Sequence, residues 1–121
     1  MARQPEEYLD DLLEATAAIR AYTQPGKRAF LRNAMVRDAV VARLLQVGEA
    51  VKGAQAGGID LATLAPQIPW AQIAGMRDLL SHQYWRTDPQ TVWAVVEKDL
   101  KPLEAAARKL RSVLRRARGK K

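Results

Sequence analysis

The sequence predicts an all-α protein, a bundle of four or five helices. Almost every long segment repeats its apolar residues at steps of three and four, the period of one helix face. No segment shows the alternation of apolar and polar residues that is typical of a half-buried strand. The chain has 121 residues, and 48% of them are apolar, which suits one domain with a core and is too short for two comfortable ones. We therefore expect residues 1–121 to form a single helical domain.

The first helix is predicted to begin at Pro5 and to end before Pro25-Gly26. Proline fits the first turn of a helix, and the acidic residues that follow it suit the positive end of the helix dipole. Proline followed by glycine is a strong breaker. The apolar face of this helix consists of Tyr8, Leu12, Ala15, Ile19 and Tyr22.

The second helix is predicted as one continuous element from about Lys27 to about Ala54. A glycine inside it, Gly48, costs roughly 1 kcal/mol relative to alanine, and a close contact with a neighbouring backbone is one way to offset that cost. The predicted core positions are Val40, Leu44, Val47, Val51 and Ala54.

Two further helices follow a connector that starts at Gly57-Gly58 and holds one short turn near residues 60–64. The third helix is predicted over residues 69–85, with an apolar side made of Ile73, Met76, Leu79 and Leu80. The fourth begins after Asp88, which can cap it, with Pro89 in its first turn. Its apolar stripe extends to Leu114. Pro102 within this stripe is expected to kink the helix or to split it.

The positive charge of the protein is concentrated at its C-terminal end. The formal net charge is +7, yet residues 98–121 alone hold ten Lys and Arg against Asp99 and Glu104. We expect a basic C-terminal tail at residues 108–121. Such a tail attracts polyanions by counterion release, but it is equally typical of a frayed, solvated chain end.

Composition excludes several classes of protein. The chain has no cysteine and one histidine, which argues against a zinc site, a thiolate nucleophile and disulfides, so we expect no metal and no cofactor. The N-terminal residues are acidic and unlike a secretory signal, and no apolar run approaches the ~18 residues of a membrane span. We expect a soluble cytoplasmic protein.

The only histidine, His82, lies in the one cluster whose composition indicates chemistry, RDLLSHQYW at residues 77–85. At about 100° per residue, Arg77, Ser81 and Tyr84 share one helix face. Asp78 and His82 form an i, i+4 pair on an adjacent face, and Arg77 and His82 are about 140° apart. Either the helix ends near His82 and its imidazole turns back, or a second subunit completes the site.

These side chains suit the cleavage of RNA without a metal. Histidine titrates near neutral pH and can move the proton of a ribose 2′-hydroxyl. Arginine can hold a phosphate and its developing charge, and tyrosine can bind phosphate or stack on a base. Spacing alone also allows a purely structural reading, since cationic side chains favour the C-terminal ends of helices.

The stretch resembles the HEPN superfamily and, within it, the HepT-type toxin ribonucleases, whose motif is R-x4-H-x-Y. Arg77, His82 and Tyr84 match that motif, whereas Asp78 stands where relatives usually carry asparagine. The segments at 37–53 and 87–105 are also similar to the helices that flank the motif in that family. The resemblance implies an all-α bundle that forms a two-fold homodimer with the two motifs in a cleft at its interface.

The resemblance also implies roles for these residues and partners for the chain. Arg77 is expected to bind phosphate and stabilise the transition state, His82 to act as general acid and base, and Asp78 to support them. Tyr84 is expected to contact RNA and to be AMPylated by a small nucleotidyltransferase antitoxin of the MNT type, as in type VII-like toxin–antitoxin systems. Glu49 either faces the cleft or pairs with Lys52 or Arg43 on its own helix.

Two alternatives to a ribonuclease are left open by the sequence. A HEPN dimer that binds RNA or a nucleotidyltransferase without cutting would need the same cluster and the same basic tail. DNA binding by a basic helix is a weaker alternative, because nothing resembles a helix-turn-helix or a heptad followed by a basic region.

Overall fold

A computed structural model describes residues 3–83 and 86–119 of the chain. Within these ranges the chain forms six helices and no strand, which confirms the predicted all-α fold class. The helices are α1 (Pro5–Tyr22), α2 (Lys27–Arg32), α3 (Ala34–Ala56), α4 (Leu61–Leu64), α5 (Trp70–Gln83) and α6 (Pro89–Gly119).

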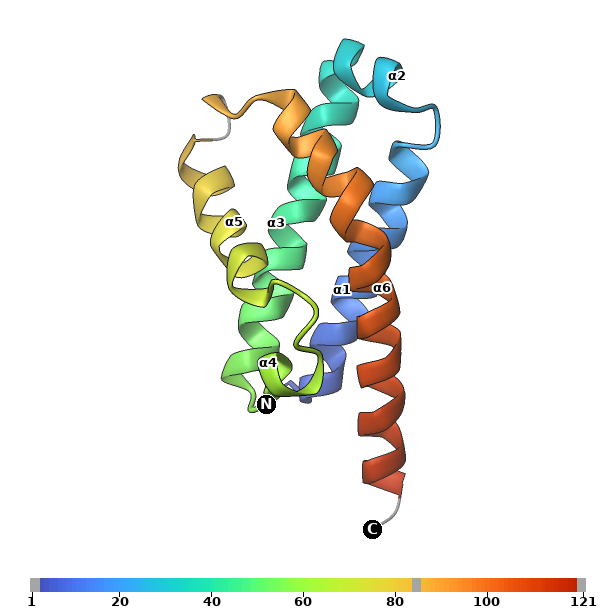
Figure 1. Ribbon diagram of the computed structural model, residues 1–121, viewed down its shortest axis with the longest axis vertical. Helices are drawn as coiled ribbons and strands as arrows, with labels where there is room; N and C mark the ends of the chain where they lie inside the picture. Colours follow the sequence, from blue (N-terminus) through green and yellow to red (C-terminus); the bar gives the residue numbers. More distant parts are fainter. Residues whose placement is uncertain (1–2, 84–85, 120–121) are drawn as a thin grey trace.

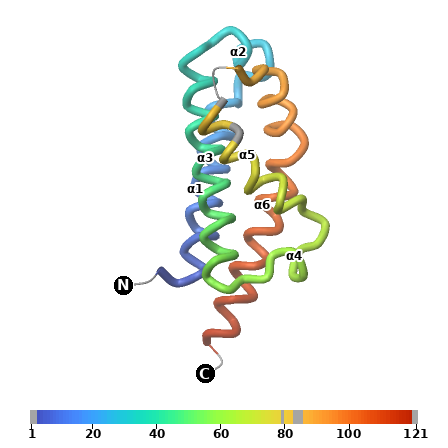
Figure 2. The backbone as a smooth tube through the Cα atoms, turned by 90° about the vertical axis from the view of Figure 1, so that its left-hand side faces the viewer, coloured from blue at the N-terminus to red at the C-terminus, as the bar shows by residue number. Residues whose placement is uncertain are grey.

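The four long helices form the bundle. In Figure 1, α3 lies between α1 and α5, and α6 packs along α1. The two short helices lie near opposite ends of the bundle, α2 at the top and α4 near the bottom, as the second view in Figure 2 shows. Since α5 packs chiefly against α3, the contact between α3 and α5 decides how the motif helix is placed.

The predicted apolar faces form the core. In α3, all five predicted core positions are at most 4% exposed. Leu12, Ala15 and Ile19 of α1 are buried likewise, and Tyr8 and Tyr22 pack at the edge of the core. In α5, Ile73 and Leu80 are buried and Met76 is partly buried, while the side chain of Leu79 lies outside what the structure describes.

The prediction of one continuous second helix is wrong, because the helix breaks at Asn33. The backbone of Asn33 is extended (φ −116°, ψ 104°), and its side-chain oxygen accepts a hydrogen bond from the amide of Val36 at 3.2 Å. Asparagine is a preferred helix N-cap, and here it starts α3. The break lets α2 turn toward α6, where the rings of Phe30 and Trp93 lie 5.3 Å apart.

The predicted helix starts at Asp60 and Asp88 are confirmed by their capping contacts, while the predicted end of the third helix at residue 85 lies outside the described residues. Asp60 accepts a hydrogen bond from the amide of Thr63 at 3.3 Å and starts α4. Asp88 accepts one from the amide of Gln90 at 2.9 Å, with Pro89 as the first residue of α6. Because these caps bind backbone donors that a helix leaves free, each one fixes where its helix begins.

The last helix, α6, continues through Pro102 and is not split there. Pro102 lies on the exposed side of the helix. The basic segment that begins at residue 108 is part of α6 as far as Gly119. None of the described helices is long and apolar enough to cross a membrane.

Candidate active site

The motif helix touches α3 at Gly48. A Cβ atom added to this glycine would lie 2.5 Å from the Cβ of Arg77, closer than real Cβ atoms approach. The two backbones therefore meet more closely here than any larger residue allows. The cost of a glycine inside α3 is thus matched by a close helix contact at the root of the Arg77 side chain.

The guanidinium of Arg77 is held by two carboxylates. Its Nε donates to Glu49 of α3, and its Nη1 donates to Asp78 at 2.9 Å. No hydrogen bond joins its Nη2 to a described residue. The side chain is 37% exposed, so a group in solution can reach the remaining donors.

A second cation completes the cluster. The ammonium of Lys52 donates to both oxygens of Asp78, at 3.1 and 3.0 Å. Asp78 thus bridges a cation of α3 and one of α5. We call Arg77, Asp78, Glu49 and Lys52 the Arg77 cluster; it holds two positive and two negative groups.

These contacts shift two pKa values. The hydrogen bond from Arg77, followed by those from Lys52, holds the pKa of Asp78 below its ordinary value. Hydrogen bonds to Asp78 and Glu49 raise the pKa of Arg77. Both groups therefore stay charged near neutral pH, and the cluster keeps its balance of charge.

His82 stands apart from this cluster. It lies in the last turn of α5, and its side chain is exposed. It makes no hydrogen bond or ion pair with the residues that the structure describes. Because the backbone is still helical at His82, the angular separation of about 140° from Arg77 holds here.

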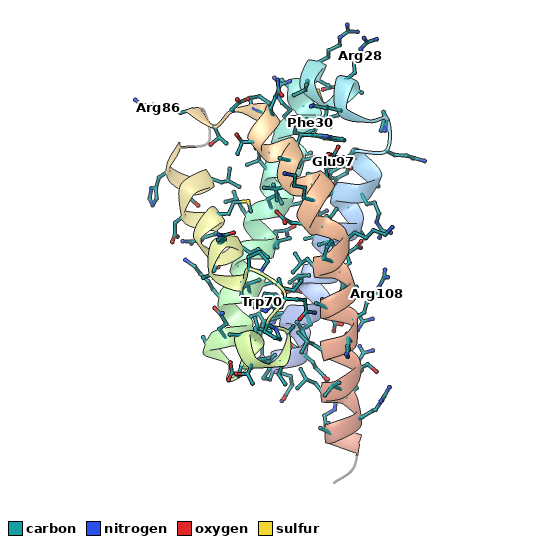
Figure 3. All side chains as sticks on the ribbon, in the orientation of Figure 1. Arg28, Phe30, Trp70, Arg86, Glu97 and Arg108 are labelled. Carbon is teal, nitrogen blue, oxygen red and sulfur yellow. The ribbon has the colours of Figure 1, made fainter. Side chains whose placement is uncertain are left out.

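The remaining motif residue, Tyr84, lies outside the described residues, as does Trp85. The chain is described again from Arg86, which is exposed and extends away from the bundle in Figure 3. The structure therefore brings together Arg77 and Asp78 from the predicted site, leaves His82 in solvent one turn later, and does not test Tyr84.

A mostly apolar groove of about 350 Å³ runs beside the motif helix, between α5 and α6. Ile73, Met76 and Leu80 line it from α5, and Val92 and Val95 line it from α6. The side of α5 that does not pack on α3 therefore offers an apolar surface.

Comparison with known proteins assigns the fold and the motif to one family. The family description "Ribonuclease HepT-like" matches residues 12–110. The chain belongs to the HepT-like ribonuclease family. The match includes α3 and the motif helix, which build the Arg77 cluster and carry His82, and most of α6.

Curated members of the HepT-like family cover most of the chain. A protein of Thermococcus cleftensis named "Probable ribonuclease HepT" is 35% identical over 112 residues, which is 92% of this chain and 99% of that protein. A candidate RNase of Methanocaldococcus jannaschii is 34% identical over 104 residues, 86% of this chain and 78% of that protein. No solved structure gives a significant match.

Sequence reasoning left two members of the Arg77 cluster unassigned. It left open whether Glu49 faces the cleft or pairs with Lys52 or Arg43 on its own helix, and the structure pairs Glu49 with Arg77 of α5. It gave Lys52 no role at the motif, whereas Lys52 binds Asp78. The available signal was their spacing: residues 49 and 52 are i, i+3 neighbours that follow Gly48, so they share the face that meets α5.

Proposed function

We propose that the protein is a metal-independent endoribonuclease, with Arg77 as the phosphate ligand and His82 as the general acid and base. The observation that carries this proposal is the pair of exposed groups on the last turns of α5. Arg77 is a guanidinium oriented by two carboxylates, with N–H donors that no described residue accepts from, and His82 is an imidazole without a described partner. Membership of the HepT-like ribonuclease family supports RNA as the substrate.

The proposed reaction is attack of a ribose 2′-hydroxyl on the adjacent phosphorus. A base removes the hydroxyl proton, the O2′–P bond forms, and the P–O5′ bond breaks as an acid protonates the leaving oxygen. The products are a 2′,3′-cyclic phosphate and a free 5′-hydroxyl. Arg77 stabilises the negative charge on the phosphorane oxygens through its available N–H donors.

A two-fold homodimer completes this mechanism. One imidazole cannot act as base and acid in the same step, and the chain has one histidine. Two copies bring two His82 residues and remove the difficulty that Arg77 and His82 of one helix point about 140° apart. The apolar groove between α5 and α6 supports this assembly, because a second copy would cover apolar surface beside the motif.

Asp78 and Glu49 determine the net charge of the Arg77 cluster, where RNA is proposed to bind. With both carboxylates in place the Arg77 cluster is neutral, so an incoming phosphate competes with them for the guanidinium. Asp78 stands where relatives usually carry asparagine. Asp78→Asn would leave the cluster with one net positive charge, and it is expected to raise RNA affinity at low salt.

We further propose that Tyr84 is the point of control, in a toxin–antitoxin pair of the type VII kind. The match of R-x4-H-x-Y supports this assignment. AMPylation of Tyr84 by an MNT-type nucleotidyltransferase would add bulk and negative charge two residues from His82. Such a group repels RNA phosphate and blocks the cleft.

The test is cleavage of mixed tRNA and mRNA, in EDTA, by wild-type protein and by His82→Ala. Cutting by the wild type alone is the expected result, with an unchanged dimer by sedimentation in both. Retained cutting by His82→Ala would overturn the mechanism. If neither protein cuts, mass spectrometry of residues 77–86 decides. AMP on Tyr84 identifies a silenced toxin, and unmodified Tyr84 favours a HEPN module that binds RNA or protein and cuts nothing.

A further inference from the structure

The basic residues near the C-terminal end of α6 fall into two groups with different surroundings. The first group faces α1. Arg111 donates to Asp10 at 3.0 Å, Arg115 lies 3.5 Å from the same carboxylate, and Arg118 pairs with Glu6. We call Arg111, Arg115 and Arg118 the inner arginines. Their ion pairs hold α6 against α1.

The second group faces solvent. All five of its members are exposed, and none makes a hydrogen bond or ion pair with the described part of the chain. At about 100° per residue they fall within an arc of about 100°, and at 1.5 Å per residue they extend over about 27 Å of helix. We call them the outer stripe: Lys98, Lys101, Arg108, Lys109 and Arg116.

No carboxylate shares the arc of the outer stripe. Between residues 98 and 116 the only acidic residues are Asp99 and Glu104. Glu104 is buried against Thr16 and Arg20, and Asp99 is turned about 100° from Lys98 along the helix. Glu97 borders the arc one turn before Lys101, where it accepts a hydrogen bond from Trp93 at 3.1 Å. The outer stripe thus carries five positive charges that make no ion pair with the described residues, whereas the Arg77 cluster is neutral.

We propose that the outer stripe is a second RNA-binding surface, which holds the phosphate backbone of a long or structured RNA away from the cleavage site. This inference rests on the proposed function for the identity of the polyanion. In Figure 3, Arg108 lies on the side of α6 that is turned away from α5, the helix that carries Arg77 and His82. A long RNA can contact both surfaces at once, so the stripe is expected to add most to the binding of longer substrates.

An anionic membrane is the main competing ligand for such a stripe. Membrane-surface helices insert an apolar face beneath their basic residues. The apolar face of α6 is not available for this, since Leu100, Leu103, Ala107 and Leu110 are buried in the core. Beside the outer stripe, the described part of α6 exposes one large apolar side chain, Val113, which is 45% exposed. This is much less apolar area than a membrane-surface helix inserts, so the stripe favours a nucleic-acid backbone.

The test compares two triple variants that remove the same charge from the same helix. Arg108→Gln/Lys109→Gln/Arg116→Gln neutralises part of the outer stripe, and Arg111→Gln/Arg115→Gln/Arg118→Gln neutralises the inner arginines. The probes are 2′-O-methyl RNAs of about 40 and 6 nucleotides, which have no 2′-hydroxyl to react. Binding is measured by fluorescence anisotropy from 50 to 200 mM salt.

The outer variant is expected to bind the long RNA with a log–log salt slope that is smaller by about 2, since each contact contributes about 0.7. The wild type then loses roughly 20-fold more affinity than the outer variant over this fourfold rise in salt. The short RNA can make fewer of these contacts, so its salt slope should differ less between the wild type and the outer variant. The inner variant should keep the slope of the wild type and melt at a lower temperature.

An equal decrease of the salt slope in both triple variants, or no decrease in the outer variant, would contradict RNA binding by the outer stripe. So would wild-type binding to vesicles with 30% phosphatidylserine that the outer variant loses while it keeps RNA binding. Lys98→Gln/Lys101→Gln repeats the test on the first turns of the stripe if the triple variant does not fold. Cleavage of unmodified RNA is scored separately. Stripe-dependent binding without cleavage, by protein whose Tyr84 carries no AMP, rejects the proposed function alone. Cleavage with stripe-independent binding rejects the stripe alone.

Discussion

Among the described residues, ion pairs join α1 to α6 and α3 to α5, and the ion pair at Glu104 differs from those at Arg77 in how far water reaches the carboxylate. Between α1 and α6, the Glu104 side chain is 7% exposed and accepts hydrogen bonds from Arg20 at 2.8 Å and Thr16 at 3.2 Å. Between α3 and α5, Glu49 and Asp78 are 56% and 52% exposed, although they bind cations at similar distances.

This difference separates charges that hold the fold from charges that are available to a ligand. A carboxylate inside a core is strongly destabilising when its partner is lost. An exposed ion pair contributes about 0–1 kcal/mol, and water can replace either member. The Arg77 cluster therefore contributes little to the free energy of folding, and a phosphate can enter it at small cost.

The sharpest way to break this comparison is to remove one arginine from each pair of helices. Arg77→Ala is expected to lower kcat/KM for RNA by about 10²–10³-fold, because a donor to the developing charge is lost. Arg111→Ala removes the same charge from the α1–α6 contact and should leave cleavage unchanged. Cleavage assays and urea unfolding of both variants provide the measurement. If Arg77→Ala cuts as well as Arg111→Ala, the cluster is structural.

The buried carboxylate gives the largest expected change in stability. Arg20→Met leaves Glu104 in the core with only Thr16 beside it, and it should lower the free energy of unfolding by about 3 kcal/mol. Adding Glu104→Leu removes the stranded charge and should restore most of that loss. Urea midpoints of the single and double variants test this. If Arg20→Met is as stable as the wild type, water solvates Glu104 in that variant and the carboxylate is not stranded.

One methyl group added at position 48 should destabilise the contact between α3 and α5. Gly48→Ala places a Cβ 2.5 Å from that of Arg77, so α5 must move, with a loss of about 1–3 kcal/mol in stability and a lower kcat. Gly75→Ala is the matched control, since a Cβ there meets nothing within 4 Å and should stabilise α5 by up to about 1 kcal/mol. Thermal unfolding compares the two. Equal effects of the two substitutions would contradict the close contact.

The smallest effect concerns the titration of Asp78. Its pKa is depressed, so its stabilising contribution is present above its ordinary pKa and is lost as pH falls through the depressed value. Arg77→Ala should raise this pKa more than Lys52→Met does, because the hydrogen bond from Arg77 is the larger cause. Carboxyl ¹³C NMR below about pH 5 can follow it. A pKa that neither substitution moves would exclude both hydrogen bonds in solution.

Most of the fold could be predicted from the sequence because helix faces are local. The steps from Val40 to Ala54 follow directly from the helical period, and all five positions are buried. The break at Asn33 could not be read in the same way, because the residues on both sides of it suit a helix. Asn33 is a preferred cap, but one such residue does not require a break; the contact of Phe30 with Trp93, more than sixty residues away in sequence, stabilises the turned α2.

Only the residues of the candidate site that lie on α5 could be predicted from the sequence. Spacing put Arg77, Asp78 and His82 on α5, but it could not decide whether Glu49 pairs with Lys52, three residues away on α3, or with a cation of another helix. That choice depends on how α3 and α5 align, which no local pattern contains. The basic end of α6 was ambiguous for the same reason, since only the position of Asp10 and Glu6 separates the inner arginines from the outer stripe.

The glycine at position 48 has one more consequence, which concerns the alignment of α3 and α5 along their lengths. Leu44 and Lys52 lie one helical turn before and one turn after Gly48 on α3. Their Cβ atoms exclude so close an approach by Arg77. Sliding α5 by a turn therefore separates the two helices. A residue without a side chain thus fixes the height at which Arg77 faces Glu49, and substitutions at 49, 52 or 78 can alter the charge of the site without moving its backbone.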